Sequence, residues 1–487
     1  MMQFGNVTAR ACAVVLVAAC AAHADFSTLP AALAKDLASN DAKARVRARQ
    51  LLPRHGMAAL DHVLPLLASE DQGARLSAYN VAADIANAAA GPGHDADRHV
   101  AASKLMALAA PGQPEVVVLQ ALRLLPIVTP DGFDVGPIAA ILNGTDAKMR
   151  EKARECLGLM ATDAACDALI DAAPKADAAF AAALLDEVAA LRNPRALDRA
   201  AAMLAHGDAT VRAAAARTVA WSGDTRFVGP LNDAVAKATP ETRADAYDAL
   251  LRLADAMVQR GGNWDTAIAV YRNVLASAPQ PTIQGAAMTG LGRYGDGTVV
   301  DAIAKAAVAA NGALDDQAAL ALTSLQGREG VLGAIAAYPQ LQEAVRVSML
   351  AIWGQQKQIE AIDLMQQELA GTSAPVRDRA LRALADVGSM KAFAALVGVA
   401  KNGSDTERAF ALGAVKQMAG NLGNTGDKQA AGLAFMQLYG LTDDPALRAE
   451  AIKGIAANPV PQAFDVAKDA LESADLKSSA IEALAAV

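Results

Sequence analysis

The chain has 487 residues, of which 53% are hydrophobic and only 4% are aromatic. Because a single hydrophobic core stops growing at roughly 250 to 300 residues, a chain of this length divides into domains or forms a stack of repeats. The formal net charge of −8 argues against a general DNA- or RNA-binding protein, which needs a basic face to displace counterions.

Alanine supplies most of the apolar residues, and it both favours helices and lets neighbouring helices approach closely. The β-branched residues form none of the alternating runs that are typical of strands. The composition therefore predicts an all-α protein with a thin core.

Residues 1–24 have the features of an export signal. A short polar region with Arg10 is followed by the apolar run 11–22, and Ala22-His23-Ala24 is a small-x-small cleavage site. The apolar run is too short to span a bilayer core of about 30 Å. We therefore expect a periplasmic or secreted protein. A second interpretation is a lipoprotein, because Val17-Ala18-Ala19-Cys20 resembles a bacterial lipobox in which Cys20 is lipidated.

Basic residues crowd the segment that follows. They are Lys43, Arg45, Arg47, Arg49 and Arg54. Their spacing spreads them around a helix and does not line one stripe, so we interpret them as the solvated face of a terminal capping repeat, in preference to a partner-binding patch.

The densest group of titratable residues is His94-Asp95-Ala96-Asp97-Arg98-His99. Asp95 and His99 are four residues apart, so this loop, together with Asp134, could hold a divalent metal or build an enzymatic site. We favour a simpler interpretation, an acidic first helical turn in which Asp95 and Asp97 complement the helix dipole. The sequence fixes no third metal ligand.

Two cysteines, Cys156 and Cys166, flank a predicted turn at Thr162-Asp163. In an oxidising compartment they could form a disulfide that closes one helical hairpin and stabilises it by about 2 to 4 kcal/mol. The alternative is a pair of buried thiols that behave as small hydrophobic residues. The sequence does not decide between the two.

One pattern recurs along the chain: a short polar turn, then a small or aliphatic residue followed by Arg, then alanines and leucines at helical spacing. Its clearest copies begin at Asp146, Asp208, Pro375 and Asp444. The predicted second helices start near residues 41, 71, 114, 146, 177, 208, 240, 281, 315, 343, 375, 405, 444 and 475. The usual interval of about 30 to 34 residues accommodates two short helices and two turns. Stacking buries the apolar flank of each hairpin, so the sequence predicts an α-solenoid of about 14 hairpins.

The run Asp208-Ala-Thr-Val211-Arg212-Ala-Ala-Ala-Ala216 resembles the second-helix signature of the HEAT-repeat family, and the resemblance extends over residues 28–487. It implies an armadillo-like solenoid in which the turn Asp and the helix Arg contact equivalent residues of neighbouring repeats. The pairs that would form this polar ladder are Asp146 with Arg150, Asp208 with Arg212, and Asp444 with Arg448. Independently of the resemblance, we expect these aspartates to cap their helices.

One unit departs from the pattern. Its residues Gly262, Trp264, Ala267, Tyr271, Leu275 and Pro279 stand at spacings that resemble the second helix of a tetratricopeptide repeat. We therefore divide the chain into a signal peptide (1–24), an N-terminal HEAT-like arm (25–240), a TPR-like insert or junction (241–281) and a C-terminal HEAT-like arm (282–487). The glycine-containing segment 420–426 is interpreted as a lengthened turn.

The last predicted helix, Ser478 to Val487, is apolar along Ile481, Leu484 and Val487. Terminal repeats usually need a polar outer face for solubility. We therefore expect this end to dock on a partner or on a second copy of the chain.

The sequence contains no phosphate-binding P-loop, no nucleophile elbow and no H-E-x-x-H helix. We therefore expect a non-enzymatic protein-interaction scaffold of the periplasm or cell envelope, with no catalytic residues, cofactor or metal. The expected partner is a protein of unknown identity, not a nucleic acid, and no transmembrane helix is expected. The alternatives are a metal-binding or enzymatic protein with its site at His94–His99, and a helper for a separately encoded enzyme. The binding surface is expected near Trp264 and Tyr271 or at the C-terminal end.

Overall fold

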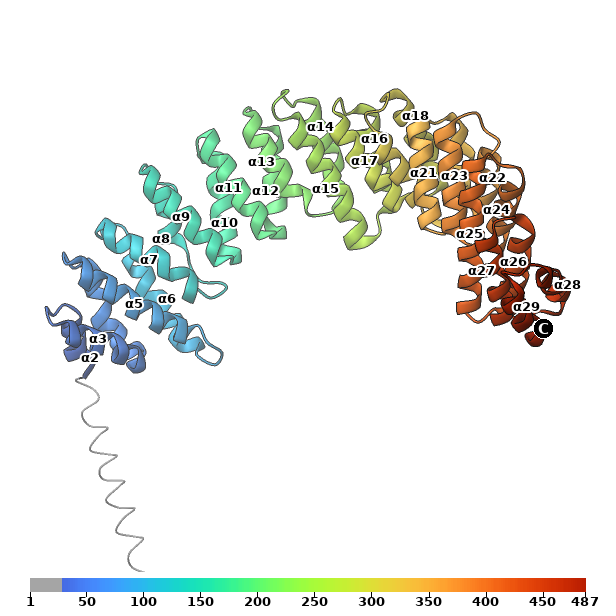
Figure 1. Cartoon of the computed structure of the whole chain (residues 1–487). Coiled ribbons are helices and arrows are strands. Elements are labelled where there is room, and N and C mark those ends of the chain that lie inside the picture. Colours follow the sequence, from blue (N-terminus) through green and yellow to red (C-terminus); the bar gives the residue numbers. More distant parts are fainter. Residues whose placement is uncertain (1–28) are drawn as a thin grey trace, which may run out of the picture. The chain divides into compact units, whose positions relative to one another are not determined.

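The computed structural model describes residues 29–487, and their regular structure is entirely helical. It consists of 28 α-helices, α2 to α29, with short 3-10 segments between them, and Figure 1 labels most of these helices. The predicted signal peptide 1–24 and the lipobox at Cys20 lie outside the described residues, so export and lipidation stay predictions.

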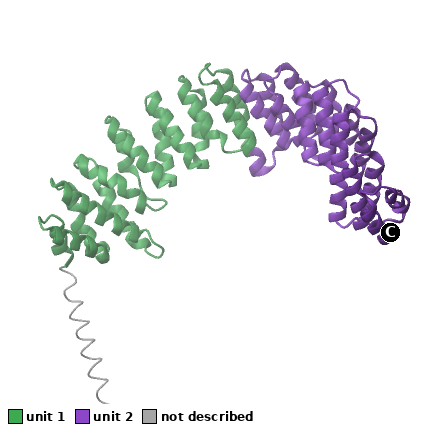
Figure 2. Cartoon of the chain, in the orientation of Figure 1, with its two compact units in different colours: residues 1–256 green, residues 257–487 purple. Residues whose placement is uncertain are grey.

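The chain separates into two compact units, Met1–Ala256 and Met257–Val487 (Figure 2). The division falls inside the segment 241–281, and the arms 25–240 and 282–487 themselves stay predictions. The helices of the first unit are α2 (Leu29–Leu37), α3 (Ala42–Leu51), α4 (Met57–Val63), α5 (Gln72–Ala89), α6 (Asp95–Leu108), α7 (Glu115–Val128), α8 (Gly136–Leu142), α9 (Ala147–Met160), α10 (Asp163–Ala172), α11 (Ala178–Leu191), α12 (Leu197–Ala202), α13 (Ala209–Ala220) and α14 (Val228–Ala236).

Helix α15 (Arg243–Gly261) spans the division. The helices of the second unit are α16 (Trp264–Ser277), α17 (Pro281–Tyr294), α18 (Val300–Ala309), α19 (Asp315–Ser324), α20 (Gly327–Ala337), α21 (Glu343–Gln355), α22 (Ile362–Glu368), α23 (Ala374–Val387), α24 (Met390–Asn402), α25 (Asp405–Asn424), α26 (Lys428–Leu441), α27 (Pro445–Ala457), α28 (Phe464–Asp469) and α29 (Lys477–Ala486).

The predicted solenoid is confirmed. From α3 to α29, the odd-numbered helices begin within three residues of the starts that the repeat pattern predicts. Within each unit, consecutive odd-numbered helices pack on one another, as α11 does on α13 and α21 does on α23. Figure 1 shows the hairpins following one another in chain order within each unit. The odd-numbered helices are therefore the second helices of stacked hairpins.

The turn aspartates cap the second helices, as predicted. Asp146 Oδ1 accepts a hydrogen bond from the backbone N–H of Met149 at 3.0 Å, and Asp444 Oδ1 accepts one from that of Ala446 at 2.8 Å. Asp208 Oδ1 accepts from the backbone N–H groups of Thr210 and Val211. These bonds satisfy donors that have no partner inside a helix, so the repeat aspartate fixes where each second helix begins.

The arginine of the repeat pattern mainly contacts carbonyl oxygens of its own hairpin, whereas the resemblance implies contacts with residues of neighbouring repeats. Arg212 Nη1 donates to the carbonyl oxygens of His206 and Gly207, both at 2.8 Å, and Arg377 Nη1 donates to that of Gly371 at 2.9 Å. These carbonyls belong to the turn that ends the first helix. The arginine therefore ties the two helices of one hairpin together by supplying donors and positive charge at a helix C-terminus.

The predicted ladder of Asp and Arg side chains is thus only partly right. Arg150 lies 3.5 Å from Asp177, the turn aspartate of the next hairpin, but Arg212 reaches its next hairpin through the carbonyl oxygen of Lys237 at 3.1 Å. Arg448 contacts Asp443 in its own turn at 2.6 Å. The physical reason is that the guanidinium groups of Arg212 and Arg448 already donate to carbonyl oxygens of the turns before their own helices.

We expect the Arg212→Ala variant to lower the free energy of unfolding by about 2 kcal/mol, because hydrogen bonds from a charged donor contribute about 1.5 to 3 kcal/mol. Urea denaturation followed by circular dichroism measures the change. Arg123→Ala is the control, since Arg123 is exposed on α7 and its loss should change stability by less than about 0.5 kcal/mol. Equal losses in the two variants would show that the three carbonyl contacts are not stabilising.

Acid should weaken the first unit through its capping aspartates. Hydrogen bonds from Thr210, first from its hydroxyl and then from its backbone, lower the pKa of Asp208, and the Arg226 side chain lowers the pKa of Asp224. A carboxyl with a lowered folded-state pKa stabilises the fold above its unfolded value of about 4, and this stabilisation disappears as the pH falls through the folded value.

We therefore expect the urea midpoint of the wild-type protein to stay nearly constant from about pH 7 to 5 and to fall below about pH 4. Asparagine also caps helices but does not titrate. The Asp208→Asn variant should consequently lose little stability at neutral pH and fall less steeply in acid. Parallel pH profiles for the two proteins would contradict the role given to Asp208.

The core of this solenoid is thin, and its helices pack with their backbones close together where small residues meet. A Cβ atom on Gly292 of α17 would lie 2.5 Å from the Cα of Ala321 in α19, and one on Gly354 of α21 would lie 2.9 Å from the Cα of Ala383 in α23. The same small-residue contact thus recurs between second helices of successive hairpins. It holds their backbones nearer to each other than larger residues would permit.

The segment 420–426 is a turn only at its end, at Thr425 and Gly426. Helix α25 continues through Gly420 and Gly423 to Asn424, which makes it 20 residues long, and α26 starts at Lys428. A Cβ atom on Gly423 would lie 2.9 Å from the side-chain oxygen of Asn458. This glycine therefore provides room for the chain that follows α27 and does not end the helix.

Cys156 on α9 and Cys166 on α10 are free and buried, which matches the second of the two alternatives. Burial raises the pKa of the Cys156 thiol. Burial, followed by the charge of Asp167, raises the pKa of Cys166 to about 11. Both groups are therefore protonated, unreactive members of the core at neutral pH.

Candidate binding groove

The His94–His99 loop does not assemble a metal site. His94 Nδ1 lies 3.5 Å from a carboxylate oxygen of Asp97, and the ring of His99 packs edge-on against Phe133 at 5.4 Å. The Asp134 carboxylate accepts a hydrogen bond from the backbone N–H of Gly136 at 2.8 Å. Within residues 29–487, no three His, Cys, Asp or Glu side chains are placed to hold a metal ion.

The basic segment near the N-terminus lies on α3 and the 3-10 turn after it. Arg45 donates to the carbonyl oxygen of Ser39 at 2.6 Å, in the same manner as the other repeat arginines. Lys43, Arg47, Arg49 and Arg54 are exposed. The interpretation of these side chains as a solvated face stays a prediction.

The predicted aromatic unit is mostly core. Tyr271 is 1% exposed and its ring stacks on that of Tyr294 at 6.2 Å, while Trp264 packs edge-on against Tyr294 at 5.7 Å. Only Trp264, at 47% exposure, offers a substantial surface for a partner. The resemblance of this unit to a tetratricopeptide repeat stays a prediction.

The C-terminal helix α29 keeps part of its apolar face exposed. Ile481 is 54% exposed, whereas Ala480 and Ala483 on the same helix are buried. Leu484 is half-buried. The expectation that this end docks on a partner or a second copy therefore stays a prediction, with Ile481 as the exposed large apolar residue of α29.

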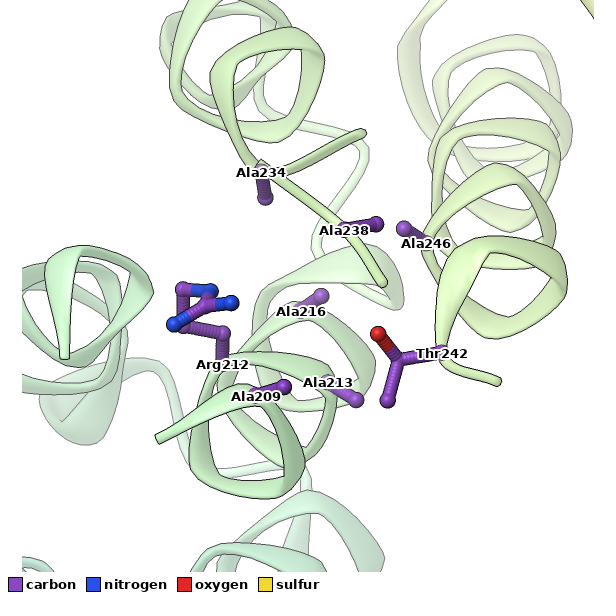
Figure 3. A pocket seen from close by; sticks show the side chains of 8 residues that line it. All are labelled: Ala209, Arg212, Ala213, Ala216, Ala234, Ala238, Thr242 and Ala246. Carbon is purple, nitrogen blue, oxygen red and sulfur yellow. The ribbon is translucent and has the colours of Figure 1, made fainter. Parts of the chain in front are cut away.

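Three hollows recur at one place in the repeat, beside the arginines Arg150, Arg212 and Arg377. Figure 3 shows the one at Arg212, which is otherwise lined by Thr242 and six alanines of the first unit. Its space of about 10 Å³ barely holds one water molecule. Because these hollows accompany the arginine that closes each hairpin, the repeat itself explains them.

A fourth hollow does not sit beside a repeat arginine and is larger, about 820 Å³. It lies between the second helices of two successive hairpins, and we call it the α23–α25 groove. The residues that line it are Lys357, Arg379, Arg382, Ala385, Asp386, Val387, Gly388, Ala409, Phe410, Gly413, Ala414, Gln417, Met418, Asn421, Leu422 and Thr425. Its volume falls within the usual range for ligand sites, about 300 to 1,000 Å³.

Several of the residues that line the groove are small. Ala385 of α23 and Ala409 and Gly413 of α25 are among the lining residues, and a Cβ atom on Gly413 would have no other atom within 4 Å. A glycine inside a helix costs about 1 kcal/mol relative to alanine. Here it leaves the backbone of α25 open to close approach by another molecule.

Positive charge collects on the α23 side. Arg379 Nη2 donates to Asp386 at 2.8 Å, while the Arg379 Nε atom is buried without a hydrogen-bond partner. Arg382 donates through Nε and Nη2 to the two carboxylate oxygens of Asp378, which raises the pKa of its guanidinium. The guanidinium of Arg382 also lies over the ring of Phe410, 5.0 Å from its centroid.

Sequence reasoning missed this groove. The spacing of Phe410, Gln417 and Asn421 on one face of a helix is visible in the sequence, but the interpretation of 420–426 as a turn ended that face too early. The arginines of α23 come from the preceding hairpin, one repeat of about 30 residues earlier. No local pattern indicates that the two faces meet.

No protein-family model matches the sequence, and no curated protein matches it either. Among solved structures, the chain is similar to yeast importin-β (Kap95p) as seen in a structure with RanGDP. The two chains have 12% identity and a TM-score of 0.44, and the match covers 94% of this chain and 72% of Kap95p. Kap121p bound to Ste12p matches with 12% identity and a TM-score of 0.41, and the match covers 93% of this chain and 52% of Kap121p. This chain therefore spans about half the length of Kap121p.

A chain from a study of the interaction between cadherin and β-catenin has 12% identity and a TM-score of 0.32, over 93% of this chain and 98% of that chain. Human deoxyhypusine hydroxylase also matches, with 18% identity and a TM-score of 0.25, over 58% of this chain and 94% of that chain. The packing of its own helices makes the chain an α-solenoid of stacked helical hairpins. These likenesses concern the fold alone and do not choose between binding and catalysis.

Among the described helices α2 to α29, none combines the length and the apolar character that a membrane span requires.

Proposed function

We propose that the protein is a non-enzymatic interaction scaffold of the periplasm or cell envelope, and that it holds an extended segment of a protein partner in the α23–α25 groove. The observation that carries this proposal is the groove itself, which is open, close to 820 Å³ in volume and lined by both apolar and polar side chains. Mixed lining of this kind binds ligands through apolar contact and fixes their orientation through a few polar groups.

The shape of the groove favours a chain segment over a compact small molecule. It extends along α25 from Ala409 to Thr425, which corresponds to roughly 24 Å at the helical rise of 1.5 Å per residue. About seven residues of an extended peptide cover that distance. Second helices of solenoids form long surfaces of this kind because each hairpin adds one helix to the same layer.

A blocked groove tests the proposal. The Gly413→Tyr variant places a large side chain in open space, so it should fill the groove without disturbing α25. The matched control is Gly440→Tyr on α26, where a new side chain also meets no atom within 4 Å and which is not a lining residue of the groove.

The measurement is quantitative cross-linking of the full chain in envelope extract, with partners identified by mass spectrometry. We expect a set of partners that the Gly440→Tyr protein retains and the Gly413→Tyr protein loses. Identical partner sets for the two variants, or no partner for any form of the protein, would count against the groove as the binding site.

A further inference from the structure

We infer that the partner segment held in the α23–α25 groove is acidic and extended, with carboxylates that meet Lys357, Arg379 and Arg382 and a backbone that pairs with Gln417 and Asn421. This inference rests on the proposed function and adds the chemical class of the partner.

The charge of the groove is opposite to that of the chain. Its lining includes three cationic side chains but only one carboxylate, Asp386, whereas the whole chain carries a formal charge of −8. Arg379 uses one Nη atom for Asp386 and keeps its Nε without a partner. Arg382 binds Asp378 through Nε and Nη2 only, so its Nη1 remains available to a carboxylate of the partner.

Lys357 adds a third cation to the lining of the groove. It follows α21 in a left-handed backbone conformation, with φ of 55°, and in the described part of the chain no carboxylate pairs with it. An exposed ammonium group on a flexible stem can follow an acidic side chain wherever the partner presents it. The three cations therefore offer contacts to two or three carboxylates spread along one segment.

The amide side chains on the other wall match an extended backbone. Gln417 and Asn421 are four residues apart on α25, so they stand about 6 Å apart along the helix. Alternate residues of an extended chain repeat at about 6.6 Å. Each carboxamide has both a donor and an acceptor, so successive side chains can pair with the N–H and C=O groups of alternate partner residues.

The same features disfavour other polymers. A basic segment would place like charges against Arg379, Arg382 and Lys357, and this repulsion disfavours its binding. A single-stranded nucleic acid needs aromatic faces on which its bases can stack, and the lining of the groove offers one aromatic ring, Phe410, with Arg382 over one of its faces. An acidic peptide is the class that satisfies both the cations and the amides.

Selection from a library of random twelve-residue peptides displayed on phage tests the inference with the full chain as the target. Peptides are selected on the wild-type protein and depleted on the Gly413→Tyr protein, so that only groove-dependent binders remain. We expect these binders to be enriched in Asp and Glu, and their affinity to fall as the salt concentration rises, since screening weakens exposed charge pairs.

The affinity of synthetic copies of the selected peptides for protein variants then tests the contribution of the cationic side chains. The Arg382→Ala and Lys357→Gln variants should each weaken binding about two- to fivefold, as expected for partly exposed ion pairs, whereas Arg123→Ala should leave it unchanged. Thermal unfolding of each variant checks that the fold is retained. Two variants in different segments keep the test informative if one of them folds poorly.

The outcomes separate the inference from the proposed function. Groove-dependent peptides that are neutral or basic, or that bind the Arg382→Ala and Lys357→Gln proteins as tightly as the wild type, would overturn the acidic class while leaving the groove as a peptide site. A selection without groove-dependent peptides would overturn both.

Discussion

Replacing Trp353 by alanine is expected to lower the free energy of unfolding by about 3 to 5 kcal/mol, the usual range for large aromatic residues in a core. Trp353 lies on α21, is only 1% exposed, and packs against Tyr338 with ring centroids 6.0 Å apart. In a core built largely from alanine, few neighbouring side chains can move to fill the cavity. Hydrogen exchange should show faster opening of α19, α21 and α23, since a solenoid transmits such losses mainly to adjacent hairpins.

Tyr338 provides the matched control for this variant. Its hydroxyl group is buried without a hydrogen-bond partner, and burial raises its pKa. The Tyr338→Phe variant keeps the ring and removes only the unsatisfied hydroxyl, so stability should stay within about 1 kcal/mol of the wild type or increase. A large loss in Tyr338→Phe, or a loss below about 1 kcal/mol in Trp353→Ala, would contradict this account of the pair.

The Gly432→Ala variant is the second change with a large expected effect, a loss of about 3 kcal/mol, which is the upper end of the usual cost of overpacking a core. A Cβ atom on Gly432 of α26 would lie 2.8 Å from a methyl carbon of Val460 and closer still to the backbone oxygen of Asn458. Backbone cannot move aside as a flexible side chain can, so the added methyl group forces α26 away from the segment after α27.

Gly440→Ala is the control on the same helix. Gly440 is exposed near the end of α26 and a Cβ atom there meets nothing within 4 Å. Alanine should therefore stabilise the helix by up to about 1 kcal/mol through its higher helix propensity. Urea denaturation of both variants gives the comparison. If the two substitutions shift the midpoint in the same direction, close approach at Gly432 is not what limits the packing.

The repeat was predictable because its signals are local. An aspartate that caps a helix interacts with backbone groups two or three residues ahead, as Asp208 does with Thr210 and Val211. These interactions lie within one turn of chain, so the starts of the second helices follow from residue types and spacing alone.

The pattern does not reveal which partner a side chain selects among several nearby. Arg212 was expected to meet side chains of a neighbouring repeat, but it binds mainly the carbonyls of its own hairpin.

The role of a glycine likewise depends on tertiary packing as well as on the local sequence. Glycine usually marks a break in a helix, and by that rule segment 420–426 is a turn. In the structure, Gly420 and Gly423 lie inside α25, and Gly423 faces Asn458 from a later hairpin. Whether a glycine ends a helix or admits a neighbour depends on what packs against it, and the neighbour here lies more than 30 residues away.

By itself, the sequence determined the all-α class, the hairpin period and the capped starts of the second helices, because helix capping and apolar periodicity act within a few residues. Only the tertiary structure decided where the α23–α25 groove lies and which charges line it. The reason is that Arg379 and Arg382 come from one hairpin and Phe410, Gln417 and Asn421 from the next. Their convergence depends on the lateral register of two packed helices, which side-chain shape and close backbone approach set between distant parts of the chain.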